Sequence, residues 1–496
     1  MRPFLTAFFG ACAITGAAKA QIYVDPRLGN DSNPATQCMP VRTITQAVTL
    51  LGTSPGQMIF LAAGEYSVAS GEQFPITVPA SAQALLMAGS SLEGAKITTP
   101  MGPQTPYPAL QTFCDLVVLQ NIDIKSQFTA VKSTFSGSAS SGFIANNVDI
   151  NAGLDGIHLI GTPATTIERT KISTSQICVH LESVPSGTST PQVNVRSAYL
   201  ESAFYGIFDA TTHGGSAQLN CAGSIFRGLQ RGYEKTGIGA TDVQFENCTF
   251  YRNGFFTLIP ASFDGAIVRG TSTGAIHVNN CLFAETFGSN DFIGYSPATD
   301  TVTNCIVTQA SLVGLGGSFQ AAVSFVDGPN GDLHLTAPSA AIDAGGTPAF
   351  AAADIDGYPF ALDCASGAAD IGADEYVHDF CYIASDLNLG SIAKVRMHAD
   401  AGELFLAVWS LPMDSPPSTL CGAPYIPASY TFLTSTTSGS GAGVSTVGAN
   451  GVGELLSPLP SSAALAGVTL WFQGVAVQVG GSMQISRNVY VGTFEP

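Results

Sequence analysis

A series of polar and aromatic residues recurs at the same place in successive short β segments. Each member follows an apolar residue, and because strand side chains alternate, we expect the apolar residue to point inward and the member outward. The series comprises Lys132, His158, His180, Phe208 and Glu234. If the segments stack as parallel strands about 4.8 Å apart, these side chains form one column on an outer face.

This column combines groups that act on a long sugar chain. An aromatic ring such as Phe208 stacks on a sugar ring, and a histidine or lysine removes the α-proton of a uronate. Asp155 lies in the turn before His158 and is placed to orient it, while Tyr205 adds a second aromatic ring. The candidate catalytic residues are therefore Lys132, His158, His180, Glu234 and Asp155. The alternative is that these positions are polar only because they face water.

A basic group lies around the last position of the column, in an acidic chain whose formal charge is −18. It comprises Arg227, Arg231, Lys235 and Arg252. Guanidinium groups pair with carboxylates or sulfates in a bidentate manner, so we expect these residues, with Phe208 and Tyr205, to bind substrate. The alternative is pairing with Glu234 and Glu246 at a solvated surface.

Two acidic clusters have the oxygen ligands that calcium requires. Asp25 and Asp31 lie near the start of the chain, and Asp354 and Asp356 lie near the C-terminal end of the predicted β-helix. Neither cluster completes an EF-hand loop, and the alternative is that these residues cap turns. Calcium is the one cofactor that the sequence indicates, and only as a candidate.

Two familiar catalytic motifs are absent from the sequence: H-E-x-x-H and the P-loop. Cys248, Cys281 and Cys305 each follow an aligned Asn, and we expect buried thiols or one disulfide between coils. Cys381 and Cys421 are a plausible bridge further on.

An irregular internal repeat positions all of these residues. Its reference positions are 22 to 33 residues apart, at 121, 147, 169, 197, 223, 247, 280 and 304, and five of the eight are Asn. Two dozen residues bury no core alone, but stacked coils do, and this period is typical of a parallel β-helix. A second short strand follows about eleven residues after each of the first five positions. The predicted fold is all-β, a right-handed parallel β-helix followed by a smaller β-sandwich.

Both ends of the chain differ from the repeat. Residues 1–20 are typical of a secretory signal, with Arg2, a short apolar run and Ala18-Lys19-Ala20. Residues 21–376 are the predicted β-helix, with an N-terminal cap at 21–100 and a C-terminal cap at 327–376. Ile44, Ala47, Val48 and Leu51 have helical spacing, so a helix is expected to cover the first coil. Residues 377–496 are the predicted sandwich.

Charge and hydropathy exclude some partners. The net negative charge repels phosphate backbones, so we expect no nucleic-acid partner. After the signal, the sequence has no apolar run long enough for a transmembrane segment. We therefore expect a secreted or cell-surface protein, with surface anchoring through the C-terminal region as a further possibility.

Motifs at both ends of the predicted β-helix resemble those of secreted bacterial proteins of the pectin-lyase-like superfamily. They are Tyr23-Val-Asp25-Pro, Leu61-Ala-Ala-Gly64, Gly331-Asp-Leu-His-Leu335 and Asp370-Ile-Gly-Ala-Asp374. The later pair is similar to a choice-of-anchor exit motif, although Phe360 replaces its usual arginine. The resemblance implies a right-handed parallel β-helix that binds or cleaves polysaccharide. The catalytic motifs of polygalacturonases and the Arg-rich motif of pectate lyases are absent.

Two functions follow from these observations. The first is a non-catalytic module that binds a polysaccharide or cell-surface glycan, or builds the cell surface. The second is a polysaccharide lyase or glycoside hydrolase that works on the Lys132–Glu234 face. The absence of known catalytic motifs favours the first.

Overall fold

The structure is a computed structural model, and the predicted signal segment lies outside the residues that it describes. Those residues are 21–51, 58–82, 84–90, 94–100, 107–135, 142–161, 164–182, 192–202, 204–212, 216–254, 265–271, 273–287, 290–351, 353–356, 360, 368–376, 381–383, 392–398, 402–410, 431–432, 444–447, 452–458, 469–477, 483–485 and 490–493.

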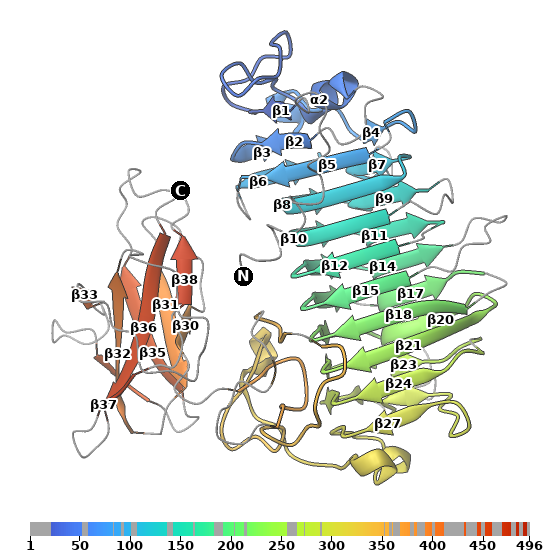
Figure 1. Cartoon of the computed structure of the whole chain (residues 1–496), viewed down its shortest axis with the longest axis vertical. Coiled ribbons are helices and arrows are strands. Elements are labelled where there is room, and N and C mark those ends of the chain that lie inside the picture. The colour runs from blue at the N-terminus through green and yellow to red at the C-terminus, as the bar shows by residue number, and fades with distance from the viewer. Residues whose placement is uncertain are drawn as a thin grey trace, which may run out of the picture.

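The chain folds as a parallel β-solenoid, as the repeat predicted (Figure 1). An 18-stranded sheet forms two of its faces. Its strands are β1 (Gln21–Val24), β2 (Met58–Leu61), β3 (Gly64–Tyr66), β5 (Ala84–Gly89), β6 (Ala95–Thr98), β8 (Leu116–Ser126), β10 (Gly142–Ala152), β12 (Ala164–Glu168), β13 (Lys171–Thr174), β15 (Gln192–Arg196), β16 (Tyr199–Ser202), β18 (Ser216–Ala222), β19 (Ile225–Arg227), β21 (Ala240–Glu246), β22 (Thr249–Tyr251), β24 (Ile276–Asn279), β25 (Leu282–Ala284) and β27 (Thr301–Thr303).

A nine-stranded parallel sheet forms the remaining face and carries the predicted column. Its strands are β4 (Ile76–Val78), β7 (Leu110–Thr112), β9 (Val131–Thr134), β11 (Asp155–Ile160), β14 (Ile177–Glu182), β17 (Tyr205–Ala210), β20 (Arg231–Lys235), β23 (Gly265–Val268) and β26 (Phe292–Ile293).

The repeated Asn position is where each coil bends between the two faces of the larger sheet. Asn121, Asn147, Asn247, Asn280 and Asn304 all have φ between 49° and 55°. This left-handed backbone is open to Gly and tolerated by Asn, which explains the residue type at the repeat. The Asn side chains also bond along the stack, since Asn147 Nδ2 donates to Asn121 Oδ1 over 2.8 Å.

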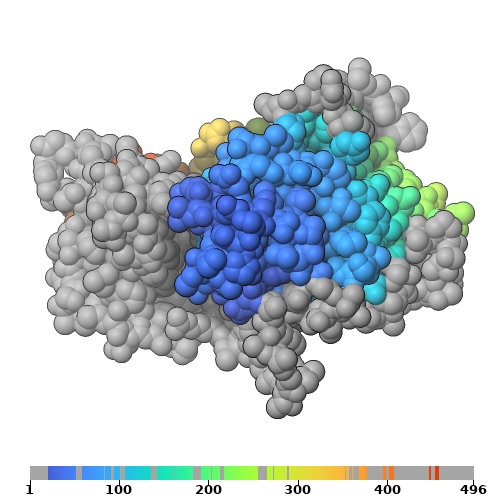
Figure 2. All heavy atoms as spheres, turned by 90° about the horizontal axis from the view of Figure 1, so that it is seen from above, coloured from blue at the N-terminus to red at the C-terminus, as the bar shows by residue number. Residues whose placement is uncertain are grey.

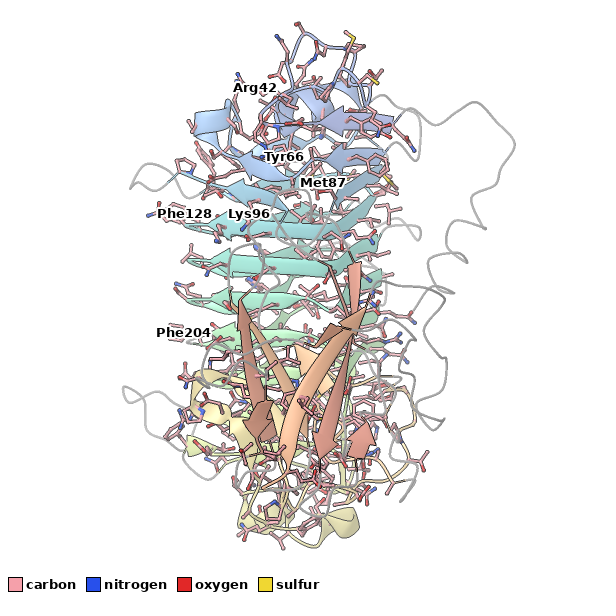
Figure 3. All side chains as sticks on the ribbon, turned by 90° about the vertical axis from the view of Figure 1, so that its left-hand side faces the viewer. Arg42, Tyr66, Met87, Lys96, Phe128 and Phe204 are labelled. Atoms are coloured by element: carbon pink, nitrogen blue, oxygen red, sulfur yellow. The ribbon has the colours of Figure 1, made fainter. Side chains whose placement is uncertain are left out.

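Apolar side chains stack inside the solenoid, one per coil. The rings of Phe226, Phe250 and Phe283 lie parallel, with centroids 4.7 and 4.9 Å apart. Such aromatic pairs contribute about 0.5–1.5 kcal/mol each beyond burial. Figure 3 draws the side chains on the ribbon, with Tyr66 and Met87 labelled in the upper coils. The cysteines at 248, 281 and 305 are buried thiols, which was one of the two expected states.

A short helix covers the first coil, as predicted. α2 (Ile44–Leu50) begins after Thr43, whose hydroxyl accepts the Gln46 amide at 3.1 Å. Its residues Ile44, Ala47 and Val48 are buried. The helix therefore closes an end that would otherwise expose a bare coil, and Figure 2 looks down on that end.

The segment after the last coil folds back along the Asn bends. It contains the 3₁₀ turns η4 (Ala310–Leu312), η5 (Leu315–Gly317) and η6 (Gly328–Asn330) and the antiparallel pair β28 (Phe325–Asp327) and β29 (Asp332–Leu335). Asn247 Nδ2 donates to Asp370 O at 3.0 Å, and Asn280 Nδ2 donates to Gly346 O at 2.8 Å. The bends thus provide the docking surface for the described residues between 341 and 376.

Two antiparallel sheets follow the solenoid. One contains β30 (Cys381–Ile383), β31 (Ile392–His398) and β35 (Val452–Pro458). The other contains β32 (Leu404–Ser410), β33 (Thr431–Phe432), β34 (Val444–Thr446), β36 (Thr469–Val477), β37 (Met483–Ile485) and β38 (Tyr490–Thr493).

Much of the region 377–496 lies outside the described residues, so its sandwich architecture and its anchoring role stay predictions. The same holds for the Cys381–Cys421 bridge, because Cys421 is outside them. Among the described residues, no helix has the length and apolar character needed to cross a membrane.

Candidate functional site

The nine-stranded sheet aligns the predicted column in one register. Lys132 pairs with His158, His158 with His180, His180 with Phe208, and Phe208 with Glu234. The preceding residues are all wholly buried, as the alternation required: Val131, Ile157, Val179, Ile207 and Tyr233. The core therefore fixes the backbone on which the column stands.

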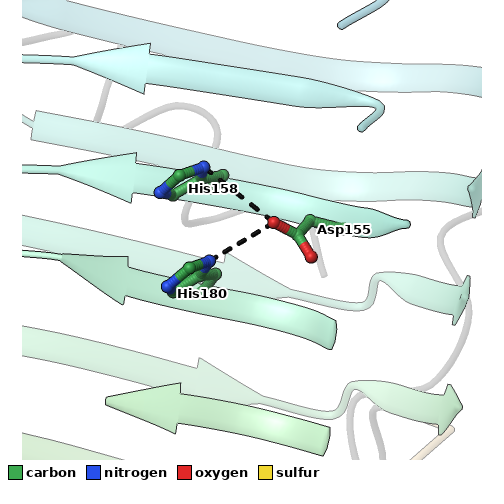
Figure 4. A group of neighbouring side chains, drawn as sticks. All are labelled: Asp155, His158 and His180. Carbon is green, nitrogen blue, oxygen red and sulfur yellow. Dashed lines mark hydrogen bonds and ion pairs between the residues drawn. The ribbon is translucent and has the colours of Figure 1, made fainter. Parts of the chain in front are cut away.

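Two histidines and two carboxylates form the polar centre of the column, and Figure 4 shows three of these residues, Asp155, His158 and His180. The imidazole rings of His158 and His180 stack with centroids 4.2 Å apart and planes 5° apart. Asp155 Oδ2 lies 3.3 Å from His180 Nδ1 and 3.9 Å from His158 Nδ1. On the other side of His158, Nε2 lies 3.0 Å from Glu182 Oε2. Asp155 thus faces both rings, as its place before His158 predicted for one of them.

Burial lowers the pKa of His158. The side chains of His158, His180 and Asp155 are exposed by only 12%, 18% and 14%. Burial first, and the neighbouring His180 second, lower the pKa of His158, while Glu182 and Asp155 oppose the shift. Lys132 adds a small lowering effect on that pKa. His158 is therefore a neutral imidazole at neutral pH, and with its proton on Nε2 it donates to Glu182.

An aromatic and cationic section continues the column over β17 and β20. The Phe208 ring meets His180 edge-on at 5.3 Å and Tyr205 at 4.9 Å between centroids. The Arg231 guanidinium lies 5.9 Å from the Tyr205 ring centroid and pairs with Glu234. Phe208 and Tyr205 are partly exposed, so the section offers an aromatic surface edged by an ion pair.

The predicted basic group does not converge. Arg227, on β19 of the 18-stranded sheet, pairs with Glu201. Arg252 directly follows β22 of the same sheet, and its Nε lies 2.7 Å from Glu285 Oε2. Lys235 has no exposed surface and binds Asp209 and Thr211 in the interior. The expectation that Lys235 contacts a ligand is therefore wrong, because its side chain points into the core with that of Tyr233.

The acidic clusters make turn contacts. Asp25 Oδ1 accepts the amides of Arg27 and Leu28 at 2.8 and 2.9 Å, and Asp31 Oδ1 accepts those of Arg42 and Thr43. These are the capping roles expected as the alternative to calcium.

The second acidic cluster contains a histidine that the sequence reasoning did not single out as a site residue. Asp354 Oδ1 accepts the Asp356 amide at 3.0 Å, and Asp356 Oδ2 lies 2.9 Å from His334 Nε2. Calcium binding remains untested at both clusters. Glu182 was also missed, although it stands two residues after His180 and its outward position follows from strand alternation.

Comparisons with known proteins give one family model and several solved structures. The family model "Protein of unknown function (DUF1565)" matches residues 27–253, which include the whole column. Among solved structures, pectate lyase Pel9A has a TM-score of 0.47 and 12% identity, covering 73% of this chain and 98% of its own. A rhamnogalacturonan lyase has a TM-score of 0.32 and 12% identity, covering 57% and 87%. The Escherichia coli protein ybhc has a TM-score of 0.33 and 15% identity, covering 58% and 78%. No curated protein matches.

Proposed function

We propose that this chain is a secreted, non-catalytic module that binds an extended polysaccharide along the outer face of the nine-stranded sheet. The observation that carries the proposal is the in-register column from Lys132 on β9 to Glu234 on β20. Five strands at the usual parallel spacing give a strip about 19 Å long. A strip of this length suits several units of one chain better than a small molecule.

The order of side chains on the strip defines the ligand class. Phe208 and Tyr205 supply rings for the apolar faces of sugars, and Lys132 supplies a cation for a carboxylate or sulfate. Arg231 lies at the same edge, 5.9 Å from the Tyr205 ring centroid, and is held there by Glu234. We therefore expect an anionic glycan to be preferred over a neutral one.

Binding is favoured over cleavage because the carboxylates of the strip already have partners. Asp155 and Glu182 lie against the histidines, and Glu234 pairs with Arg231. A glycosidase requires one carboxyl group as acid and a second as base or nucleophile. These three instead serve to hold neighbouring side chains.

The second candidate is a polysaccharide lyase. It is favoured by one observation, the lowered pKa of His158, because a neutral imidazole is the form that removes an α-proton. Export through residues 1–20 and attachment through residues 377–496 belong to the proposal and rest on the sequence.

A panel of anionic and neutral polysaccharides tests the proposal by affinity electrophoresis of the full chain. We expect retardation by an anionic glycan and its loss in Phe208→Ala. Phe287→Ala is the matched control, because Phe287 is 41% exposed and lies in the turn before β26, away from the column. Ultraviolet absorbance of unsaturated uronates, abolished in His158→Ala, would replace the binding proposal with the lyase. Retardation that is equal in Phe208→Ala and wild type would refute the proposed surface.

A further inference from the structure

Three potential metal ligands face one another on β11 and β14. We propose that Asp155, His158 and His180 bind a divalent transition-metal ion through Asp155 Oδ2 and both Nδ1 atoms. These three atoms lie within 4.8 Å of one another. The inference does not depend on the proposed glycan, because it concerns the ion alone.

The separations between these atoms are close to those of a tetrahedral site. Ligands 2.0–2.1 Å from a tetrahedral zinc ion lie about 3.3 Å from each other. Asp155 Oδ2 and His180 Nδ1 are 3.3 Å apart, and Asp155 Oδ2 and His158 Nδ1 are 3.9 Å apart. The two imidazole rings stack in parallel with centroids 4.2 Å apart, so both must turn before the in-plane lone pairs of the two Nδ1 atoms point at one ion.

Glu182 supplies the outer contact that metal-binding histidines usually have. A ligating imidazole commonly donates its other N–H to a carboxylate, which fixes the tautomer and orients the ring. His158 Nε2 lies 3.0 Å from Glu182 Oε2, so the lone pair of Nδ1 faces Asp155. The contact with Glu182 orients the His158 ring, which stacking on His180 alone would not do.

The backbone holds the ligands in place without the ion. His158 and His180 are direct partners in the parallel sheet, and the inward neighbours Ile157 and Val179 are wholly buried. Gly156 lets the strand approach the core, since a Cβ there would lie 2.4 Å from Ile172 Cγ2. Such preorganisation reduces the cost of assembling the site.

The ligand set indicates which ion is preferred. Two imidazoles and one carboxylate suit zinc, copper or nickel, whereas calcium and magnesium prefer oxygen ligands alone. Three protein ligands also leave a fourth position of a tetrahedral ion open.

A second cluster with similar residue types does not fit the same role. His334 has carboxylates on both ring nitrogens, with Asp332 Oδ1 at 2.6 Å and Asp356 Oδ2 at 2.9 Å. Asp374, the third member, is buried and accepts the Leu335 amide at 2.6 Å. Both ring nitrogens of His334 are thus already engaged by carboxylates, whereas His180 Nε2 has no carboxylate partner among the described residues.

Calorimetric titration of the full chain with zinc, after treatment with a chelator, tests the inference. We expect one equivalent at this site, lost or weakened more than about 100-fold in His158→Ala and in His180→Ala. Glu182→Gln should weaken binding by about 10- to 100-fold, because it disturbs the outer contact. His277→Ala is the control, since His277 is on β24 of the other sheet, and it should bind as wild type does.

Cobalt(II) substitution gives a second readout that needs no variant. We expect the visible spectrum of a tetrahedral ion with nitrogen and oxygen ligands and no near-ultraviolet thiolate band. A thiolate band would assign the ion to the cysteines and overturn the inference. The absence of zinc binding by the wild-type chain, or equal zinc binding by His180→Ala and wild type, would also overturn it. Circular dichroism of each variant establishes that it is folded before titration.

Discussion

The buried ion pair between Lys235 and Asp209 allows a quantitative test of how the coils are held together. Lys235 Nζ donates to Asp209 Oδ1 at 3.0 Å, to Thr211 O at 2.6 Å and to Thr211 Oγ1 at 2.8 Å. All three ammonium protons therefore have acceptors. Both side chains are almost fully buried, exposed by 0% and 3%.

Asp209→Ala leaves a buried ammonium group without its counterion. Removal of one partner of a buried pair typically lowers the free energy of unfolding by about 3–5 kcal/mol, a factor of roughly 10²–10⁴ in the unfolding equilibrium. Lys235→Met is expected to cost less, about 1–3 kcal/mol. Asp209 keeps the Thr211 amide at 3.0 Å and the Thr241 hydroxyl at 3.1 Å.

The double variant Asp209→Leu/Lys235→Met separates packing from charge. The apolar pair removes both charges but leaves the Thr211 amide and the Thr241 hydroxyl without their Asp209 acceptor, so we expect a loss of about 1–3 kcal/mol, smaller than that of Asp209→Ala. Urea unfolding followed by far-ultraviolet circular dichroism measures all three variants. The exposed ion pair between Arg252 and Glu285 is the control. Glu285→Ala should lower the free energy of unfolding by less than about 1 kcal/mol. A loss of the same small size in Asp209→Ala would refute the reasoning.

Three further predictions concern single positions. Asn280→Ala should lower the free energy of unfolding by about 1 kcal/mol more than Asn280→Gly, because only Ala is strained at φ 50°; equal losses in urea unfolding would contradict this. Burial alone would lower the pKa of His334, but Asp356 and Asp332 raise it well above its usual value, so His334 stabilises the fold most below about pH 6.5. The difference in unfolding midpoint between wild type and His334→Gln should therefore shrink as pH rises, and a difference that grows would be the opposite outcome. Cys38→Ser should remove one fast-reacting thiol from the native chain in an Ellman assay, whereas Cys178→Ser should not, because burial raises the pKa of Cys178 to about 12.

The column could be predicted because parallel coils repeat one register. Once Ile157 and Val179 are set inward, His158 and His180 must both face outward on neighbouring strands. The same alternation carries the signal that Lys235 is internal, since it follows the buried Tyr233 by two residues. We nevertheless expected Lys235 to bind a ligand at the surface, because a lysine is seldom fully buried without a partner.

Other features depend on contacts between distant segments. Ser197 occupies an Asn position of the repeat, and its hydroxyl donates to Asp354 O, 157 residues away, at 2.7 Å. Asn247 likewise binds the backbone of Asp370. No local pattern encodes such partners, so the docking of residues 341–376 on the bends was not predictable. The pairing of His334 with Asp356 has the same cause.

Hydroxyl-radical footprinting of the full chain with its best-retained glycan is the direct test of glycan binding along the column, because it reports the protection of individual side chains. We predict that the glycan protects Lys132, His180, Tyr205 and Phe208 on the nine-stranded sheet and leaves His277 on the larger sheet unprotected. Protection that maps to His277 or to the sheets after residue 381, with the column unchanged, would contradict it.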